Sequence, residues 1–135
     1  SVRFFAQQKN AVELAEYLQD CESIDKIYYP GLTSHRGHDI AKKQMDGFGA
    51  VISFELNKKI NPKLFLKSLN MINPSMSFAG VESTMLSPAE TSHYLLSLED
   101  RLTQGITDNL IRFSVGIEDV PDVVYDFEQA LNKCK

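Results

Sequence analysis

The sequence predicts an α+β fold in which a small, mostly antiparallel sheet is covered by helices. Helical and strand periodicities follow one another along the chain, without the regular strand–helix–strand rhythm of a parallel α/β sheet. The segments 48–56 and 110–115 alternate apolar and polar residues, which is typical of half-buried strands. No stretch rich in Gly, Ser or Pro divides the chain, so residues 1–135 are expected to form one domain.

The first half of the chain is expected to begin with a helix, because apolar residues recur there at helical spacing. The elements expected in this half are a helix to about residue 19, an extended piece at 27–29, a helix at 38–45, a strand at 48–56 and a helix that begins at 61–62. Asn61 can act as the N-cap of the last of these, with Pro62 at the first helical position. Leu64, Phe65 and Leu69 are expected to form its apolar side.

The second half is expected to contain two brief strands joined by a turn within 75–85, a short helix near 96–101, a strand at 110–115 and a final helix. In the strand, Ile111, Phe113 and Val115 lie on one side and Arg112 lies on the other. Asp119 can cap the final helix. The apolar stripe expected on that helix consists of Val120, Val123, Val124, Phe127, Ala130, Leu131 and Cys134.

Composition excludes several classes of protein. Apolar residues make up 43% and charged residues 24% of the chain, as in an ordinary soluble globular protein. A net charge of -4 argues against a nucleic-acid partner, and no apolar run reaches membrane-spanning length. Cys21 and Cys134 are isolated thiols, which indicates a reducing, cytoplasmic location. The chain starts inside the first expected helix without an initiator Met, so we expect a piece of a longer protein.

Arg112 is the first candidate for chemistry. Its strand neighbours Ile111 and Phe113 face a core, so the guanidinium projects from the opposite face of a rigid element. Its planar fork can hold a carboxylate through two hydrogen bonds. The pattern alone nevertheless favours a solvated or salt-bridged arginine, because charged side chains are mostly exposed.

The run from Ser77 to Ser83 is a second candidate. Small residues beside hydroxyls let a ligand approach the backbone, and free N–H groups there could bind an anion. The pattern alone favours a tight turn between strands. Glu82 lacks the paired acid that would support a catalytic carboxylate.

The histidines give little evidence for a metal site or a catalytic site. His35 and His38 could share a helical face, but no further zinc ligand falls at a suitable spacing, so no metal site is expected. Ser92 and His93 lack the surroundings of a nucleophile elbow. The residue chemistry alone therefore names no reaction.

A set of short strings, taken in order, resembles the transsulfuration family of pyridoxal-phosphate (PLP) enzymes, which comprises cystathionine γ-synthases, cystathionine β- and γ-lyases and homoserine-ester sulfhydrylases. The similarity runs from about residue 11 to residue 131. The strings are Tyr28-Tyr29-Pro30-Gly31-Leu32, Ser34-His35 with His38, Ala41, Gln44-Met45, Gly47-Phe48-Gly49, Ser53-Phe54-Glu55-Leu56, Gly80-Val81-Glu82-Ser83, Pro88-Ala89, His93, Gly105-Ile106-Thr107-Asp108 and the run from Leu110 to Asp119.

The resemblance implies a fold-type-I PLP enzyme of methionine and cysteine metabolism, of which this chain is the smaller, C-terminal domain. The Schiff-base lysine of such enzymes lies in the large domain, within a Ser-x-Thr-Lys string. That string is absent, and the nearest match, Ser23-Ile24-Asp25-Lys26, lacks the threonine. The chain alone is therefore expected to hold no PLP and to be inactive. The implied partners are its own N-terminal PLP domain, further subunits of a homotetramer, and an amino-acid substrate such as cystathionine, a homoserine ester or cysteine.

The resemblance also assigns residues. Arg112 matches the arginine that binds the α-carboxylate of the substrate, and Ser77 matches the serine that helps to orient it. Met76 occupies a position that is often glutamate in γ-specific members and aromatic in many β-lyases. Ser77-Phe78-Ala79-Gly80 replaces the usual Ser-Leu-Gly-Gly. The choice among synthase, lyase and sulfhydrylase therefore stays open.

Two alternatives to an enzyme domain remain at this point. A free-standing α+β module could bind amino acids in regulation, without catalysis. A purely structural interaction domain could use none of these residues chemically.

Overall fold

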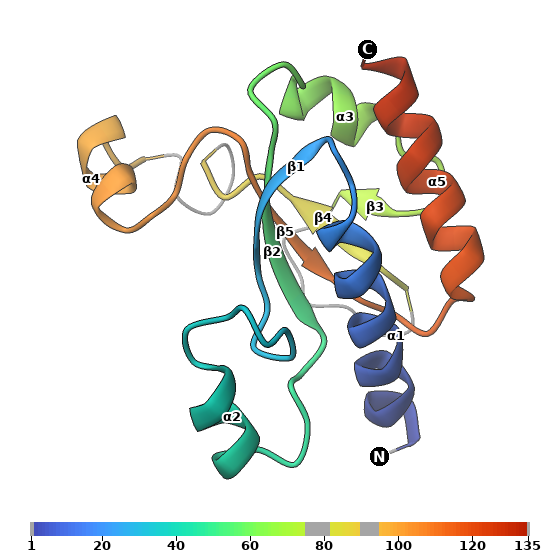
Figure 1. The fold of residues 1–135 in the computed structure, drawn as a ribbon. Helices are drawn as coiled ribbons and strands as arrows, with labels where there is room; N and C mark the ends of the chain where they lie inside the picture. Colours follow the sequence, from blue (N-terminus) through green and yellow to red (C-terminus); the bar gives the residue numbers. More distant parts are fainter. Residues whose placement is uncertain (1, 75–81, 90–94, 135) are drawn as a thin grey trace.

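The computed structural model describes residues 2–74, 82–89 and 95–134, and Figure 1 shows the arrangement of their helices and strands. The elements are α1 (Val2–Gln19), β1 (Ile24–Tyr28), α2 (His38–Gln44), β2 (Val51–Leu56), α3 (Pro62–Ser68), β3 (Asn73–Pro74), β4 (Thr84–Leu86), α4 (Leu98–Thr103), β5 (Leu110–Ser114) and α5 (Val120–Lys133). The α+β class predicted from the sequence is confirmed.

The five strands form one mixed sheet in the order β1-β2-β5-β4-β3. The pairs β1–β2, β2–β5 and β4–β5 are antiparallel, whereas β3 and β4 are parallel. Parallel neighbours cannot be joined by a tight turn, because the chain must cross back between them. The pair of turn-linked strands expected within 75–85 falls mainly on residues 75–81, outside the described residues, and stays a prediction; β4 begins at Thr84, near the end of that range.

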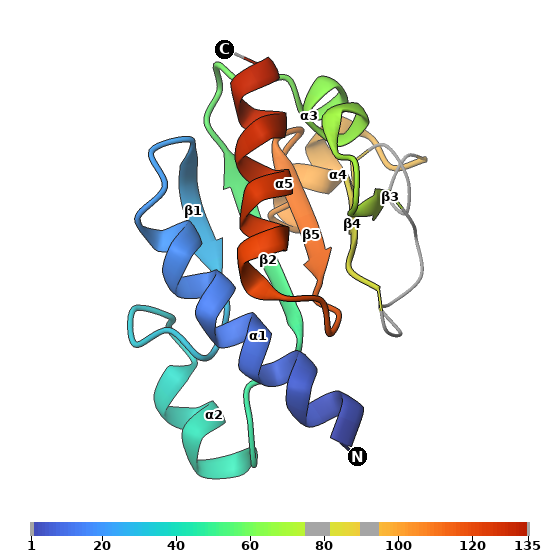
Figure 2. The ribbon, with the colours of Figure 1, turned by 90° about the vertical axis from the view of Figure 1, so that its right-hand side faces the viewer.

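Helices α1 and α5 lie across the same face of the sheet (Figure 2), and their contacts make the main core. Phe54, Phe113 and Ile111 project from the sheet into this core and are fully buried. The ring of Phe127 on α5 lies 5.7 Å from that of Phe54 and 5.2 Å from that of Phe65 on α3, in edge-to-face contacts. Burying each such side chain contributes about 1.5–3 kcal/mol, so this aromatic cluster fixes α3 and α5 to the sheet.

Helix α1 ends at residue 19, as expected. Its buried residues lie at helical spacing and are Gln7, Ala11, Leu14, Ala15 and Leu18. Within the ranges that the structure describes, no helix is both long and apolar enough to cross a bilayer.

Helix α3 begins as the sequence predicts. The Asn61 side chain accepts hydrogen bonds from the backbone N–H groups of Lys63 (3.0 Å) and Leu64 (3.2 Å). Phe65 and Leu69 are buried, but Leu64 is 45% exposed, so the expectation that it faces the core is wrong. Successive helical residues point about 100° apart, and the helix is turned so that Phe65 meets the core.

The strand expected at 48–56 begins only at Val51. Gly49 has a φ of 81°, a left-handed conformation that interrupts extended backbone and that glycine adopts at little cost. The hydroxyl of buried Tyr29 donates to the Gly49 carbonyl at 2.9 Å. The inward side of the strand, with Ile52, Phe54 and Leu56, is buried as predicted.

Helix α5 buries the central part of its predicted stripe, namely Val123, Phe127, Ala130 and Leu131. Asp119 is the N-cap residue, as predicted, although its side chain makes no capping hydrogen bond. Its backbone carbonyl accepts instead from the N–H groups of Asp122 and Val123. Asp126 is also buried, which the apolar stripe gave no reason to expect.

Candidate functional site

Arg112 lies on β5, the central strand of the sheet. Ile111 and Phe113 point into the core beneath α1 and α5 and are fully buried. Arg112 therefore projects from the opposite face, where its side chain is half-buried and its Nε atom is buried. This is the placement that the strand alternation predicts.

The two neighbours of Arg112 across the sheet differ in character. Ser53 on β2 lies opposite it on one side, and Leu86 on β4 lies opposite it on the other. Directly opposed side chains have Cβ atoms about 5 Å apart. Leu86 is 3% exposed, whereas Ser53 is half-buried. The guanidinium thus has a dry apolar wall on the β4 side and a small hydroxyl on the β2 side.

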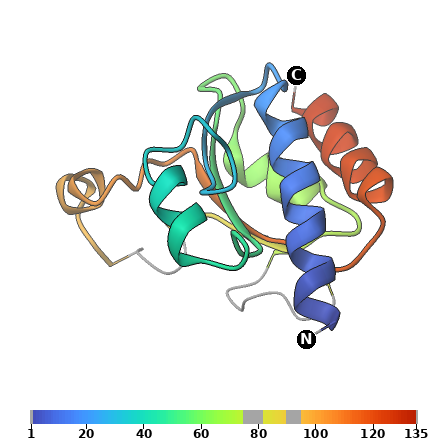
Figure 3. The ribbon, with the colours of Figure 1, turned by 60° about the horizontal axis from the view of Figure 1, so that its bottom comes forward.

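Leu110, two residues before Arg112 on the same face, belongs to a second small apolar cluster. It packs with Ala89 and Ile106, and all three are buried. The connection between β4 and β5 supplies Ala89 and Ile106, and it carries α4 away from the sheet on the side opposite α1 and α5 (Figures 1 and 3). This cluster shields one end of the Arg112 face from water.

Polar groups occupy the β1–β2 part of the same face. Tyr28 pairs with Ser53, and the Thr107 hydroxyl donates to Glu55 Oε1 at 3.3 Å. Burial, followed by the charge of Glu55, raises the pKa of Tyr28 above its ordinary value. Tyr28, Ser53 and Arg112 therefore lie side by side on three neighbouring strands, and each side chain can make hydrogen bonds. We call these three residues the Arg112 row.

A buried network that sequence patterns did not single out lies beside the ends of β4 and β5. The fully buried Ser83 donates twice to the Glu118 carboxylate: its N–H reaches Oε2 and its hydroxyl reaches Oε1, each at 2.8 Å. The Gly116 N–H donates to the Ser83 hydroxyl oxygen at 2.9 Å. We call Ser83, Gly116 and Glu118 the β4–β5 clasp. Both Ser83 and Glu118 lie within strings that carried the family resemblance.

The clasp corrects one expectation about the run from Ser77 to Ser83. The Ser83 N–H is taken up by an internal carboxylate, so it is not free to bind an external anion. Glu82 is exposed and accepts a hydrogen bond from the Asn73 side chain at 3.1 Å, which is a surface contact. Ser77 and Met76 lie outside the described residues, so their place relative to Arg112 stays a prediction.

His35 and His38, before and at the start of α2, make local contacts. His38 Nδ1 lies 2.7 Å from the Pro30 carbonyl oxygen, and its ring stacks on Phe48 at 5.4 Å. His35 Nδ1 accepts from the Gly37 N–H at 3.0 Å. Across the described ranges, no three potential metal ligands gather into a group. His93 lies outside those ranges.

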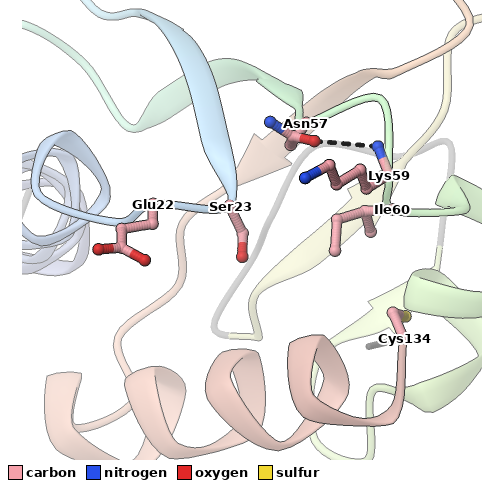
Figure 4. A pocket seen from close by; sticks show the side chains of 6 residues that line it. All are labelled: Glu22, Ser23, Asn57, Lys59, Ile60 and Cys134. Carbon is pink, nitrogen blue, oxygen red and sulfur yellow. Dashed lines mark hydrogen bonds between the residues drawn. The ribbon is translucent and has the colours of Figure 1, made fainter.

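A hollow of about 480 Å³ lies elsewhere, between the turn before β1, the loop after β2 and the end of α5 (Figure 4). Its lining residues are Glu22, Ser23, Asn57, Lys59, Ile60 and Cys134. Burial raises the pKa of the Cys134 thiol, which therefore stays protonated and weakly reactive at neutral pH. Cys21 and Cys134 are both half-buried free thiols, as expected. None of the residues in the Arg112 row lines this hollow.

Comparison with known proteins identifies the family. A family model described as "Cys/Met metabolism PLP-dependent enzyme" matches residues 1–132. The chain belongs to this family. It is 44% identical over 133 residues to a cystathionine beta-lyase of Lactococcus lactis, and 42% identical over 133 residues to an L-methionine gamma-lyase of Fusobacterium nucleatum; each match covers 98% of the chain. The predicted resemblance to the transsulfuration enzymes is confirmed.

Solved structures of family members share the fold. A cystathionine gamma-lyase from Lactobacillus plantarum, complexed with L-serine, matches 97% of the chain with a TM-score of 0.93 and 40% identity. A cystathionine gamma synthase from Xanthomonas oryzae, in complex with cystathionine, matches 98% with a TM-score of 0.91 and 36% identity. The chain spans only 34–35% of the length of these proteins and of the two curated relatives above.

The described part of the chain does not offer an anchor for the family's cofactor. A lysine that forms a Schiff base is activated by desolvation or by a neighbouring cation. All the lysines in the described ranges are exposed, and they are Lys9, Lys26, Lys42, Lys43, Lys58, Lys59, Lys63, Lys67 and Lys133. These side chains do not fit the site of covalent PLP attachment.

Proposed function

We propose that this chain is the C-terminal, substrate-binding domain of a PLP-dependent transsulfuration enzyme of the cystathionine synthase or lyase type, and that Arg112 binds the α-carboxylate of its amino-acid substrate. The observation that carries the proposal is the position of Arg112 on the central strand, half-buried on the face that α1 and α5 leave uncovered. A family member that acts on amino acids needs a fixed cation for the acid group that all its substrates share.

The surroundings suit this role physically. A carboxylate held by a guanidinium through two N–H groups gains more when water is kept away, because a low local dielectric strengthens the attraction. Leu86 and Leu110 supply that dry flank. A β-strand also holds the arginine backbone rigidly, so the bound substrate takes one orientation, and orientation alone can lower a barrier substantially.

Ser77 and Met76 complete the proposed site. The hydroxyl of Ser77 would accept or donate one further hydrogen bond that orients the carboxylate. Met76 would contact the distal part of the substrate, where an unbranched thioether offers an apolar surface and no charge. Both assignments rest on the resemblance of the sequence to the family.

The substrate class follows from the carboxylate. The relatives solved with L-serine and with cystathionine bind amino acids, and we propose cystathionine, a homoserine ester or cysteine for this protein. We further propose that the domain works with its own N-terminal PLP domain, in a cytoplasmic homotetramer, and that it is inactive alone.

Mixing the isolated chain with PLP is expected to label no single lysine. Exposed lysines have the ordinary affinity of surface amines for an aldehyde, so borohydride reduction should give weak, scattered labelling. Peptide mass spectrometry after reduction reads this directly, and the full-length protein treated identically is the control. Stoichiometric, borohydride-stable labelling of one lysine within residues 1–135 would refute the proposed division of labour.

A further inference from the structure

The β4–β5 clasp stands at the point where the strand beside Arg112 begins. Ser83 immediately precedes β4, and Gly116 and Glu118 follow β5. On the two strands themselves, Thr84 pairs with Ser114 and Leu86 pairs with Arg112. Ser83 is therefore three residues from Leu86, and Gly116 is four residues from Arg112, which corresponds to roughly 10–14 Å of extended chain from the clasp to the strand pair that holds the guanidinium.

Strand β4 needs such an anchor because it is short. It has three residues, and its outer neighbour β3 has two. A register slip of one residue would turn Leu86 away from the Arg112 face and replace it by a neighbour. Hydrogen bonds to a carboxylate are roughly twice as strong as those between neutral groups, and the clasp places two of them on Ser83.

The clasp is itself fixed from the helical layer. The Asn10 side chain on α1 donates to the carbonyl oxygens of Gly116 (3.2 Å) and Glu118 (2.8 Å). The buried Gln7 side chain donates to the Val115 carbonyl at 3.1 Å. The chain leaving β5 is thus held by α1 before Glu118 reaches back to Ser83.

We propose that Glu118 is a positioning residue for substrate binding: by holding both donors of Ser83, its carboxylate fixes the register of β4 against β5, and with it the wall beside the Arg112 guanidinium. The inference rests on the proposed function of Arg112. Glu118 itself touches no substrate. Its hydrogen bonds to Ser83 also fix the chain shortly after residues 75–81, which include Ser77.

The test replaces Glu118 in the full-length enzyme. Glu118→Gln keeps the shape of the side chain but replaces one carboxylate oxygen by an NH2 group. That NH2 group cannot accept a hydrogen bond, so one of the two Ser83 donors loses its acceptor. We expect KM for the amino-acid substrate to rise about 10- to 100-fold with a smaller change in kcat, because a displacement on the order of 1 Å at a binding group costs that much. Glu128→Gln is the matched control: Glu128 accepts from the Tyr17 hydroxyl at 3.1 Å on the exposed surface between α1 and α5.

A second readout separates positioning from stability alone. L-Alanine and L-alaninamide differ only in the carboxylate, and their inhibition constants measure how well that group is recognised. Glu118→Gln is expected to reduce the preference for L-alanine over L-alaninamide by about the same factor as KM rises. Glu128→Gln should keep this preference within about threefold of the wild-type value. Should Glu118→Gln fail to fold, Ser83→Ala, which retains the N–H bond to Glu118, is expected to shift both quantities in the same direction by less.

An unchanged KM and an unchanged alanine preference in the folded Glu118→Gln variant would overturn the inference. The Arg112→Lys variant shows whether the proposed function of Arg112 is also wrong. If Arg112→Lys loses the preference for alanine while Glu118→Gln keeps it, only the role of Glu118 is wrong. If both variants keep it, the proposed function itself is wrong.

Discussion

Arg112→Lys in the full-length enzyme is expected to lower kcat/KM by about 30- to 5000-fold, which corresponds to roughly 2–5 kcal/mol of lost transition-state binding. Lysine keeps the positive charge but offers a compact ammonium in place of a planar fork, so it cannot make two parallel hydrogen bonds to one carboxylate. Arg112 sits beside buried Leu86 and Leu110, where water cannot replace the lost bond fully. Steady-state kinetics with a transsulfuration substrate measures the effect.

Arg101→Lys is the matched control for this prediction. Arg101 on α4 forms an ion pair with exposed Asp108, at 2.8 Å between Nη1 and Oδ1. An ion pair of this kind contributes about 0–1 kcal/mol and tolerates a lysine, so kcat/KM should stay within about threefold of the wild type. If Arg112→Lys also stays within about threefold, Arg112 does not bind the substrate carboxylate.

Asp126→Asn is expected to destabilise the fold by about 3 kcal/mol, because it leaves buried donors without an acceptor. Asp126 is 3% exposed. Its Oδ1 accepts from the Asn70 N–H at 2.8 Å, and its Oδ2 accepts from the N–H groups of Met71 (2.8 Å) and Ile72 (2.9 Å). Whichever way the asparagine amide is turned, its NH2 group faces at least one backbone donor. Urea unfolding followed by circular dichroism measures the loss.

The same carboxylate predicts how stability depends on pH. Burial by itself raises the pKa of Asp126, but hydrogen bonds from Asn70, Ile72 and Met71, together with the Gln129 side chain, outweigh it and lower the pKa below its ordinary value. A pKa that is lower in the folded state stabilises the fold above the unfolded value of about 3.9, and this stabilisation disappears as pH falls through the folded value. The difference between wild type and Asp126→Asn should therefore be full at pH 7 and shrink below about pH 4.

Asp119→Asn is the control for Asp126. Asp119 is exposed and makes no side-chain capping bond at the start of the same helix, so its replacement should cost less than about 1 kcal/mol. Equal losses for the two variants, or a loss for Asp126→Asn that does not change with pH, would contradict the account of the buried carboxylate.

Periodicity was sufficient to predict the elements whose apolar residues face a single core. The alternation around Ile111, Phe113 and Arg112 gave the central strand and its open face, because a strand has only two sides. The cap at Asn61 was also predictable, since the Asn-Pro pair is itself the local signal. Family strings predicted Arg112 as the substrate contact, whereas strand alternation alone favoured a solvated or salt-bridged arginine.

Features that depend on distant partners could not be predicted in this way. Asp126 lies on an otherwise apolar stripe, and only the approach of the loop at residues 70–72 explains why a carboxylate is buried there. Glu118 and Ser83 are 35 residues apart, so no local pattern joins them. Leu64 turned outward for a similar reason, because packing of Phe65 against the core decided how α3 is turned.

The most direct measurement is a structure of the full-length enzyme with an amino-acid ligand bound. We predict that two guanidinium nitrogens of Arg112 lie about 2.7–2.9 Å from the two carboxylate oxygens of that ligand, above the row formed with Ser53. A ligand whose carboxylate is bound by another cation, while the Arg112 side chain points elsewhere, would contradict the claim that this domain binds its substrate through an arginine on the central strand of its sheet.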